Sequence, residues 1–221
     1  KGKGLRALQQ KLLNDQLENL SIPAVKYEIN PDRRLIELSD LFKNVTSFSL
    51  EIGFGGGEHL VYQAERNPNI GFIGCEPYIN GVAMLAGKLS KLELTNVRIH
   101  PGDVRDLFDV LPDDSIDSVF LLYPDPWPKK RHHRRRFVTS EYLIDLERVM
   151  KTGALLKVAT DIPDYVRQSL QEVCKHHFSW TATDAQDWRE CWSDWMPTRY
   201  ERKALREGRR PYYLTFEKRE S

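Results

Sequence analysis

The sequence predicts an α/β fold with a mostly parallel β-sheet, and three observations support this prediction. Short, nearly continuous apolar runs alternate with stretches of helical periodicity along most of the chain, which is typical of βαβ units. A glycine-rich turn follows the first of these runs and opens a helix. The 221 residues are 40% hydrophobic and 29% charged, which suits one large globular domain with a substantial core.

The predicted strands are nearly continuously apolar, as strands buried on both faces must be. They are Ser47–Ile52, Ile70–Cys75, Asn96–His100, Ile116–Leu122 and Ala154–Ala159. The helices expected between them are Glu58–Arg66, Ile79–Leu92, Val104–Val110, Glu141–Met150 and Pro163–Lys175. Gly153 is the expected stop of the fourth helix, because glycine favours the position just past a helix end.

The two ends of the chain depart from this alternation. Leu5–Leu20 is predicted to form an additional amphipathic helix that ends before Pro23. Near the C-terminus, Ser179–Thr183 and Tyr212–Lys218 are expected to form an antiparallel hairpin, with a charged helix around Tyr200–Glu207 between them.

We divide the chain into a basic, amphipathic N-terminal extension (residues 1–30) and one domain (residues 31–221). No apolar run approaches the ~20 residues that a membrane span requires, and the first residues lack the apolar stretch of a secretory signal. Three cysteines without C-x-x-C spacing are too few for a disulfide framework or a zinc site, so we expect no metal. These features predict a cytoplasmic protein that does not associate with a membrane.

The glycine-rich turn reads Glu-Ile-Gly-Phe-Gly-Gly-Gly over residues 51–57. In dinucleotide enzymes the helix that follows such a turn holds a pyrophosphate. Glu51, just before the glycines, would repel phosphate and attract a cation, and S-adenosylmethionine carries a sulfonium and an ammonium. The turn therefore favours S-adenosylmethionine, while a tight strand-to-helix turn without a ligand is the alternative.

Two more acidic residues follow the next two predicted strands. Glu76 lies 23 residues after Gly53, close to the ~20-residue spacing at which a carboxylate meets ribose hydroxyls in nucleotide-binding folds. Asp103 is placed to accept a hydrogen bond from an adenine amino group. Alternatively, Glu76 is an ordinary surface residue of a turn, and Asp103 with Asp106 caps a short helix. Ligands of open α/β sheets bind at the carboxyl ends of the strands, which favours the ligand site.

A proline-rich segment follows the fourth strand. Pro124, Pro126 and Pro128 stiffen it into an extended path and remove three amide donors. Asp125 stands where the strand leaves the sheet and is the candidate for a rigidly positioned carboxylate. The alternative is an Asp-Pro turn at the surface.

Residues 129–136 then carry six Lys or Arg and two His, although the net charge of the whole chain is only +1. Such a run repels itself unless an anion lies nearby, and nucleic-acid phosphate is the expected anion. A solvated charged segment is the alternative, and the adjacent His132 and His133 have poor spacing for a metal site.

Two further segments are candidates for the same site. Asp161 follows the fifth strand and is either the N-cap of the next helix or a carboxylate of the pocket. Residues 198–201 precede a helix with Arg202, Lys203 and Arg206, which by itself is equally typical of an exposed helix with i,i+4 pairs.

In this order the motifs resemble those of the bacterial tRNA (guanine-N7)-methyltransferase family. The specific part is Pro-Asp-Pro-Trp-Pro-Lys-Lys-Arg-His at residues 124–132. Glu-Pro at 76–77, Gly-Asp at 102–103, Ala-Thr-Asp at 159–161 and Thr-Arg-Tyr-Glu at 198–201 accompany it. The glycine turn is shared by class I methyltransferases generally, and its Gly-Gly-Gly end departs from the more varied middle residue expected in the family.

The resemblance implies a Rossmann-like class I methyltransferase fold. This fold has a mostly parallel seven-stranded sheet, an antiparallel C-terminal hairpin and helices on both faces. The resemblance also implies methylation of guanine 46 in the variable loop of tRNA, with S-adenosyl-L-methionine as the cofactor.

Matching positions imply a role for each candidate residue. The cofactor contacts are Glu51, Gly53, Gly55, Glu76, Asp103 and Asp125, of which Asp125 is also the catalytic candidate. The substrate contacts are Lys129, Asp161, Thr198, Arg199, Tyr200 and Glu201. The RNA-interacting residues are Arg131, His132, His133, Arg134, Arg135 and Arg136.

Other functions stay open at this point. The chain is alternatively a class I methyltransferase for another acceptor, because Asp125-Pro126-Trp127 partly resembles the Asp-Pro-Pro-Tyr motif of exocyclic amino methyltransferases. A non-catalytic RNA-binding protein on a methyltransferase scaffold is a second alternative. A nicotinamide dehydrogenase is disfavoured by Glu51. The sequence does not decide between a monomer and a homodimer.

Overall fold

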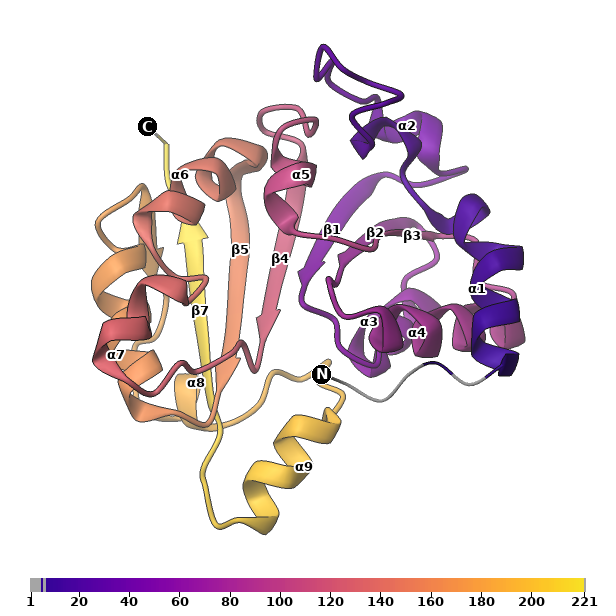
Figure 1. Cartoon of the computed structure of the whole chain (residues 1–221). Coiled ribbons are helices and arrows are strands. Elements are labelled where there is room, and N and C mark those ends of the chain that lie inside the picture. The colour runs from indigo at the N-terminus through magenta and orange to yellow at the C-terminus, as the bar shows by residue number, and fades with distance from the viewer. Residues whose placement is uncertain (1–4, 6, 221) are drawn as a thin grey trace. The chain divides into compact units, whose positions relative to one another are not determined.

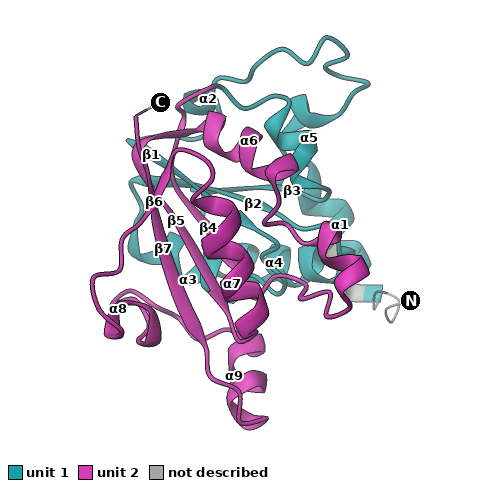
Figure 2. Cartoon of the chain, turned by 90° about the vertical axis from the view of Figure 1, so that its left-hand side faces the viewer, with its two compact units in different colours: residues 1–112 teal, residues 113–221 magenta. Residues whose placement is uncertain are grey.

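A computed structural model of the chain describes Leu5 and residues 7–220. It contains two compact units, Lys1–Pro112 and Asp113–Ser221, which Figure 2 colours separately. The basic residues 1–4 of the predicted extension lie outside the described residues. Within the described part of the chain, no helix is both long enough and apolar enough to cross a membrane.

The first unit is built on three parallel strands. In sheet order they are β3 (Val97–His100), β2 (Ile70–Cys75) and β1 (Ser47–Ile52). Its helices are α1 (Ala7–Leu20), η1 (Pro23–Val25), α2 (Leu38–Leu41), α3 (Glu58–Arg66), α4 (Ile79–Leu92) and α5 (Val104–Phe108). Strand β2 is buried except at its first residue and β1 over its last four residues, whereas β3 buries alternate residues.

Helix α1 packs on this unit, and Figure 1 shows it lying beside α4. Its Leu13 is buried in the same apolar cluster as Leu85 and Leu89 of α4. Gln16 donates a hydrogen bond to the Ser90 hydroxyl of α4 at 2.7 Å. The predicted amphipathic helix is therefore present from Ala7, and its apolar side contributes to the core of the first unit.

The second unit holds four strands. In sheet order they are β4 (Ile116–Leu122), β5 (Met150–Thr160), β7 (Tyr212–Lys218) and β6 (Phe178–Trp180). Strands β4 and β5 are parallel, whereas β7 runs antiparallel to both of its neighbours. The helices of this unit are η2 (Lys130–Arg135), α6 (Ser140–Val149), α7 (Pro163–Val173), α8 (Gln186–Arg189) and α9 (Arg199–Arg206).

Together the units supply the seven strands of the predicted mixed sheet, mostly parallel with an antiparallel C-terminal part, and this prediction is confirmed. The predicted C-terminal hairpin is present as the β6–β7 pair, although α8 and α9 separate its two strands along the chain.

The prediction for Gly153 is wrong. Helix α6 ends at Val149 and β5 begins at once at Met150, so Gly153 lies inside the strand with φ of 80°. Between the pairs Ile116↔Met150 and Ser118↔Leu155, β5 contains more residues than β4. Gly153 therefore takes a bulge conformation that other residues rarely adopt.

Candidate functional site

The glycine-rich turn at the end of β1 has a backbone that favours glycine. Gly53, Gly55 and Gly57 have φ of 71°, 55° and 71°, all in the left-handed region. Gly57 is the N-cap of α3. No atom lies within 4 Å of the place that a Cβ on Gly53 would occupy. The turn therefore leaves open space directly against its backbone, where a ligand can approach closely.

Glu76, just after β2, is joined to this turn. One carboxylate oxygen accepts a hydrogen bond from the Gly55 amide, and the other from the Tyr78 amide, both at 2.8 Å. Glu76 is only 8% exposed, so the alternative of an ordinary surface turn residue is wrong. Its two backbone bonds orient the carboxylate between the glycine turn and the start of α4. Its predicted contact with a ribose stays a prediction.

Glu51 is buried and paired with a residue that the sequence analysis missed. His59, in the first turn of α3, brings its Nδ1 within 2.7 Å of Glu51 Oε2, and the two residues are 1% and 3% exposed. Since a carboxylate only accepts, this bond places a proton on Nδ1. Gln63 lies one turn later, with its Nε2 3.4 Å from His59 Nε2. His59 and Gln63 stand four residues apart on the side of α3 that also buries Leu60 and Ala64. Polar residues at this spacing on a buried helix face are the signal that could have pointed to His59 as a partner of Glu51.

A close approach between α4 and the turn was also missed. A Cβ placed on Gly81 would lie 2.2 Å from the Gly55 carbonyl oxygen, a contact that no side chain tolerates. Because the obstacle is backbone, it cannot rotate away. A glycine inside an otherwise helical pattern is the trace that this contact leaves in the sequence, and α4 contains a second glycine, Gly87.

Asp103 forms the helix cap that the sequence analysis kept as an alternative. It is the N-cap of α5 and accepts a hydrogen bond from the Arg105 amide at 3.0 Å. Its other oxygen forms an ion pair with the Arg105 guanidinium at 2.9 Å. Partial burial raises the pKa of Asp103, but the hydrogen bonds and charge of Arg105 outweigh it and lower the pKa. The predicted adenine contact stays a prediction.

In the second unit, the proline-rich segment leaves β4 with a strained backbone. Tyr123 and Trp127 have φ of 51° and 38°, which non-glycine residues rarely adopt. Asp125, between them, is exposed. Lys129, after the third proline, is exposed and is the N-cap of η2.

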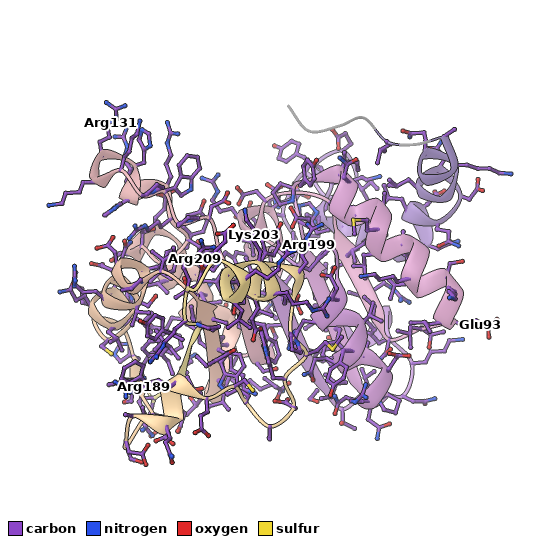
Figure 3. The ribbon with its side chains drawn as sticks, turned by 90° about the horizontal axis from the view of Figure 1, so that it is seen from below. Glu93, Arg131, Arg189, Arg199, Lys203 and Arg209 are labelled. Carbon is purple, nitrogen blue, oxygen red and sulfur yellow. The ribbon has the colours of Figure 1, made fainter. Side chains whose placement is uncertain are left out.

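The basic run is compact rather than extended, because residues 130–135 form the 3₁₀ helix η2. The Trp127 ring packs edge-on against His132 at 5.9 Å, and the Arg135 guanidinium lies over the same ring at 5.0 Å. Arg131, Arg134 and Arg135 are exposed, and Figure 3 shows Arg131 reaching outward from this segment. The exposure of these three arginines is compatible with the predicted phosphate contacts, which stay a prediction.

Arg136 requires a correction. The prediction of a phosphate contact needs a solvent-facing guanidinium, but Arg136 is 1% exposed. It donates hydrogen bonds to the Pro126 carbonyl, Gln168 and Asp164 at 2.7, 2.7 and 2.9 Å. His133 Nε2 lies 3.5 Å from the same Asp164 carboxylate, and His133 is half-buried.

Asp161 does not cap the next helix, so that alternative is wrong. The N-cap of α7 is Ile162, whose amide donates to the Thr160 hydroxyl at 3.2 Å. Asp161 instead pairs with Arg209, which also pairs with Glu207. Figure 3 shows Arg209 near α9. Asp161 thus remains a candidate pocket carboxylate with a cationic partner.

Glu201 is buried, which contradicts the alternative of a wholly exposed helix α9. It is 5% exposed, and its two oxygens accept from Trp195 Nε1 and the Tyr213 hydroxyl, both at 2.7 Å. Thr198 is the N-cap of α9 and accepts from the Glu201 amide at 3.2 Å. Arg199 donates to the Tyr200 hydroxyl at 3.0 Å.

Two candidate carboxylates of this unit, Glu201 and Asp161, act on the same tyrosine. Burial, then the charges of Glu201 and Asp161, raise the pKa of Tyr123 far above its usual range. Burial and the Glu201 hydrogen bond do the same to the pKa of Tyr213, which keeps its proton and its role as donor. The second unit therefore brings Tyr123, Asp161 and Glu201 together.

Comparison with known proteins adds an independent observation. Residues 46–214 match the family described as "Putative methyltransferase". The chain is 62% identical over 216 residues to the tRNA (guanine-N(7)-)-methyltransferase of Roseobacter denitrificans, covering 98% of this chain and 92% of that protein. It is 47% identical over 222 residues to the protein of the same name from Agrobacterium fabrum, covering 99% and 93%.

Two solved structures with the same fold are described as methyltransferases. The 16S rRNA methyltransferase KamB superposes with a TM-score of 0.62 at 16% identity, covering 83% of this chain and 93% of that chain. A structure described as an antibiotic-related methyltransferase has a TM-score of 0.57 at 17% identity, covering 85% and 98%. At such identity the likeness establishes the fold alone.

Proposed function

This chain belongs to the tRNA (guanine-N(7)-)-methyltransferase family and uses S-adenosylmethionine to methylate N7 of a guanine in tRNA, and we propose from this premise that the acceptor is guanine 46 of the variable loop. The observation that supports the cofactor part of this function is the acidic set of the first unit. Buried Glu51 and Glu76 flank a glycine turn with open space at Gly53.

The residues of the first unit fit the cofactor. Glu51 supplies a negative charge for the ammonium, and Glu76 has a fixed carboxylate for two ribose hydroxyls. Gly53 and Gly55 allow close approach of the backbone, and Asp103 accepts from the adenine amino group. A phosphate-bearing dinucleotide fits less well, because Glu51 would face its negative charge.

S-adenosylmethionine, when bound, supplies a methyl group activated by its sulfonium. Guanine N7 is unprotonated at neutral pH and carries a lone pair, so the protein needs no general base. Its task is placement, which can contribute roughly 7–11 kcal/mol of the barrier when the reacting atoms are held in line. Methyl transfer leaves positive charge on the purine, and the carboxylate of Asp125 stabilises that charge while it also contacts the cofactor.

The second unit supplies the guanine contacts of the proposal. Lys129 donates to guanine O6, and Asp161 or Glu201 accepts from the N1 and N2 hydrogens. Each oxygen of Glu201 retains a lone pair beside the bond from Trp195 or Tyr213. Residues 198–200 complete the substrate contacts.

The exposed part of the basic run binds the tRNA backbone. Arg131, Arg134 and Arg135 meet phosphates, with His132 and His133 beside them, and these contacts carry little base information. The proposed partner is tRNA, and the proposed compartment is the cytoplasm. No metal and no membrane enter the proposal.

The test is the identity and position of the methylated base. The protein is incubated with labelled S-adenosylmethionine and bulk tRNA, and the product is reduced and cleaved, since 7-methylguanosine is labile to reduction and its nucleotide can then be cleaved. We expect a single cleavage at position 46, and none in a transcript with adenine there. Cleavage at another guanine would contradict the position, and label without cleavage would contradict N7 as the acceptor.

A further inference from the structure

The segment between β4 and η2, residues 123–129, contains three residues that cannot donate a backbone hydrogen bond. Its three prolines lack amide hydrogens, so it forms no regular ladder of hydrogen bonds. Tyr123 and Trp127 take left-handed backbone angles, which persist only where the surroundings impose them. The Tyr123 amide donates to the Ala159 carbonyl of β5 at 2.7 Å, but beyond it side-chain contacts are needed to fix the proline-rich part, which carries Asp125.

Arg136 has hydrogen bonds that can fix the proline-rich segment. Its guanidinium donates through three different nitrogens, to the Pro126 carbonyl at 2.7 Å, to Gln168 Oε1 at 2.7 Å and to Asp164 Oδ2 at 2.9 Å. It also lies over the Tyr165 ring at 5.3 Å. The rigid planar fork of arginine thus joins the residue after Asp125 to the first turns of α7.

Helix α7 holds the far end of the segment as well. Gln168, which accepts from Arg136, donates its Nε2 to the Val138 carbonyl at 2.7 Å. Asp164 supplies the charge that offsets the guanidinium, and the Arg136 hydrogen bond is the main cause that lowers the pKa of Asp164. The segment from Pro126 to Val138 is therefore attached to one helix at both ends.

We infer that Arg136 is a positioning residue, which clamps the Asp125-bearing segment to α7, and that it is not one of the phosphate-binding cations of the basic run. A phosphate contact would require the guanidinium to leave three acceptors and a buried site, and Arg134 and Arg135 offer exposed guanidiniums next to it. The consequence for catalysis rests on the proposed role of Asp125. Pro126 fixes its own φ, so holding the Pro126 carbonyl restricts the Asp125 backbone immediately before it.

The substitution Arg136→Lys separates the two roles. Lysine keeps the positive charge, so a phosphate contact would survive with little loss of tRNA affinity. It cannot reproduce a planar fork with three separate acceptors, so a clamp would fail. Arg167→Lys is the matched control, because Arg167 is exposed and pairs with the same Asp164 at 3.3 Å.

Three quantities are measured for each variant. They are hydrogen exchange of residues 123–135, kcat at saturating tRNA, and tRNA affinity against salt. For Arg136→Lys we expect faster exchange in this segment, a fall in kcat of roughly ten- to hundredfold, and an unchanged salt slope. Arg167→Lys should match the parent in all three. Parental exchange and parental kcat in Arg136→Lys would overturn the inference.

A further outcome and a replacement variant complete the test of Arg136. Faster exchange with parental kcat would overturn the positioning role, whereas Asp125→Asn tests the role of Asp125 itself. If Arg136→Lys does not fold, as judged by loss of a cooperative thermal unfolding transition, Gln168→Leu replaces it. That variant removes the bond to Val138 and one acceptor of Arg136, and we expect it to loosen the same segment with a smaller fall in kcat. Parental exchange in Gln168→Leu would then refute the clamp.

Discussion

The acidic residues of the first unit and the basic residues of the second unit are held in opposite ways. Glu51 and Glu76 are buried, and their oxygens are already bound by His59 and by the Gly55 amide. Arg131, Arg134 and Arg135 stand exposed on a short 3₁₀ helix. The first arrangement is rigid before any ligand arrives, whereas the second leaves long side chains able to adjust.

This difference fits the two ligands. A small cofactor of constant shape is bound most tightly by groups that lose no freedom on binding. A polyanion is attracted through charge that acts at a distance and is screened by salt. We therefore expect cofactor binding to be insensitive to salt and tRNA binding to depend steeply on it. Four predictions test this contrast.

The largest effect is expected for Arg131, Arg134 and Arg135 replaced together by Ala. Each lost phosphate contact flattens the salt slope by about 0.7–0.9, so three flatten it by roughly two to three units and weaken tRNA binding about a hundredfold at ~0.15 M salt. Filter binding across ~50–200 mM salt measures this. Cofactor affinity should stay parental.

The control for this variant replaces three exposed lysines of the first unit, Lys26, Lys43 and Lys91, by Ala. It removes the same net charge from other elements. If the control flattened the slope as much as the arginine variant, general charge rather than the basic run would govern tRNA binding.

Asp125→Asn should come next, because it keeps the shape and removes the charge that faces the methylated purine. Loss of one preorganised electrostatic contact commonly costs ~10²–10³ in rate, and the exposure of Asp125 reduces this to about ten- to hundredfold. Single-turnover methyl transfer with both substrates saturating gives the rate. A parental rate would remove Asp125 from the chemistry.

Glu51→Ala and Glu76→Ala should each weaken S-adenosylmethionine binding about tenfold or more, the loss expected for a charge-assisted contact of ~1.5–3 kcal/mol. Calorimetry measures the affinity, and tRNA affinity serves as the control that the second unit is intact. Parental cofactor affinity in both variants would show that the first unit does not form the cofactor site.

The smallest effect is expected for His59→Leu, which leaves Glu51 buried without its donor. We expect a loss of cofactor affinity of about three- to tenfold, because the carboxylate loses its fixed orientation. His59→Asn is the control, since its amide nitrogen can replace Nδ1 as donor. Equal loss in both variants would mean that His59 acts through packing rather than through its bond to Glu51.

Several local elements could be predicted from the sequence with the correct bounds, whereas β5 is longer than predicted and β6 is shifted toward the N-terminus. Strands β1, β2, β4 and β7 and helices α3 and α4 begin and end where apolar periodicity and turn residues place them. These signals are local, because each depends on residues a few positions apart. The prediction that Gly153 ends a helix is wrong because a glycine after a helix and a glycine in a β-bulge have the same local sequence signal. Only the pairing of β5 with β4 distinguishes them.

By itself, the sequence determined the α/β fold, the glycine turn and the set of acidic and basic residues, since these follow from the order of residue types along the chain. Only the tertiary structure decided what holds them: the pairing of His59 with Glu51, the burial of Glu201 and the attachment of Arg136 to α7. The physical reason is that the burial of a polar side chain depends on which distant segment covers it. Arg134 and Arg136 stand two residues apart in one basic run, yet Arg134 is exposed, whereas Arg136 is buried and bound to α7 and to the Pro126 carbonyl.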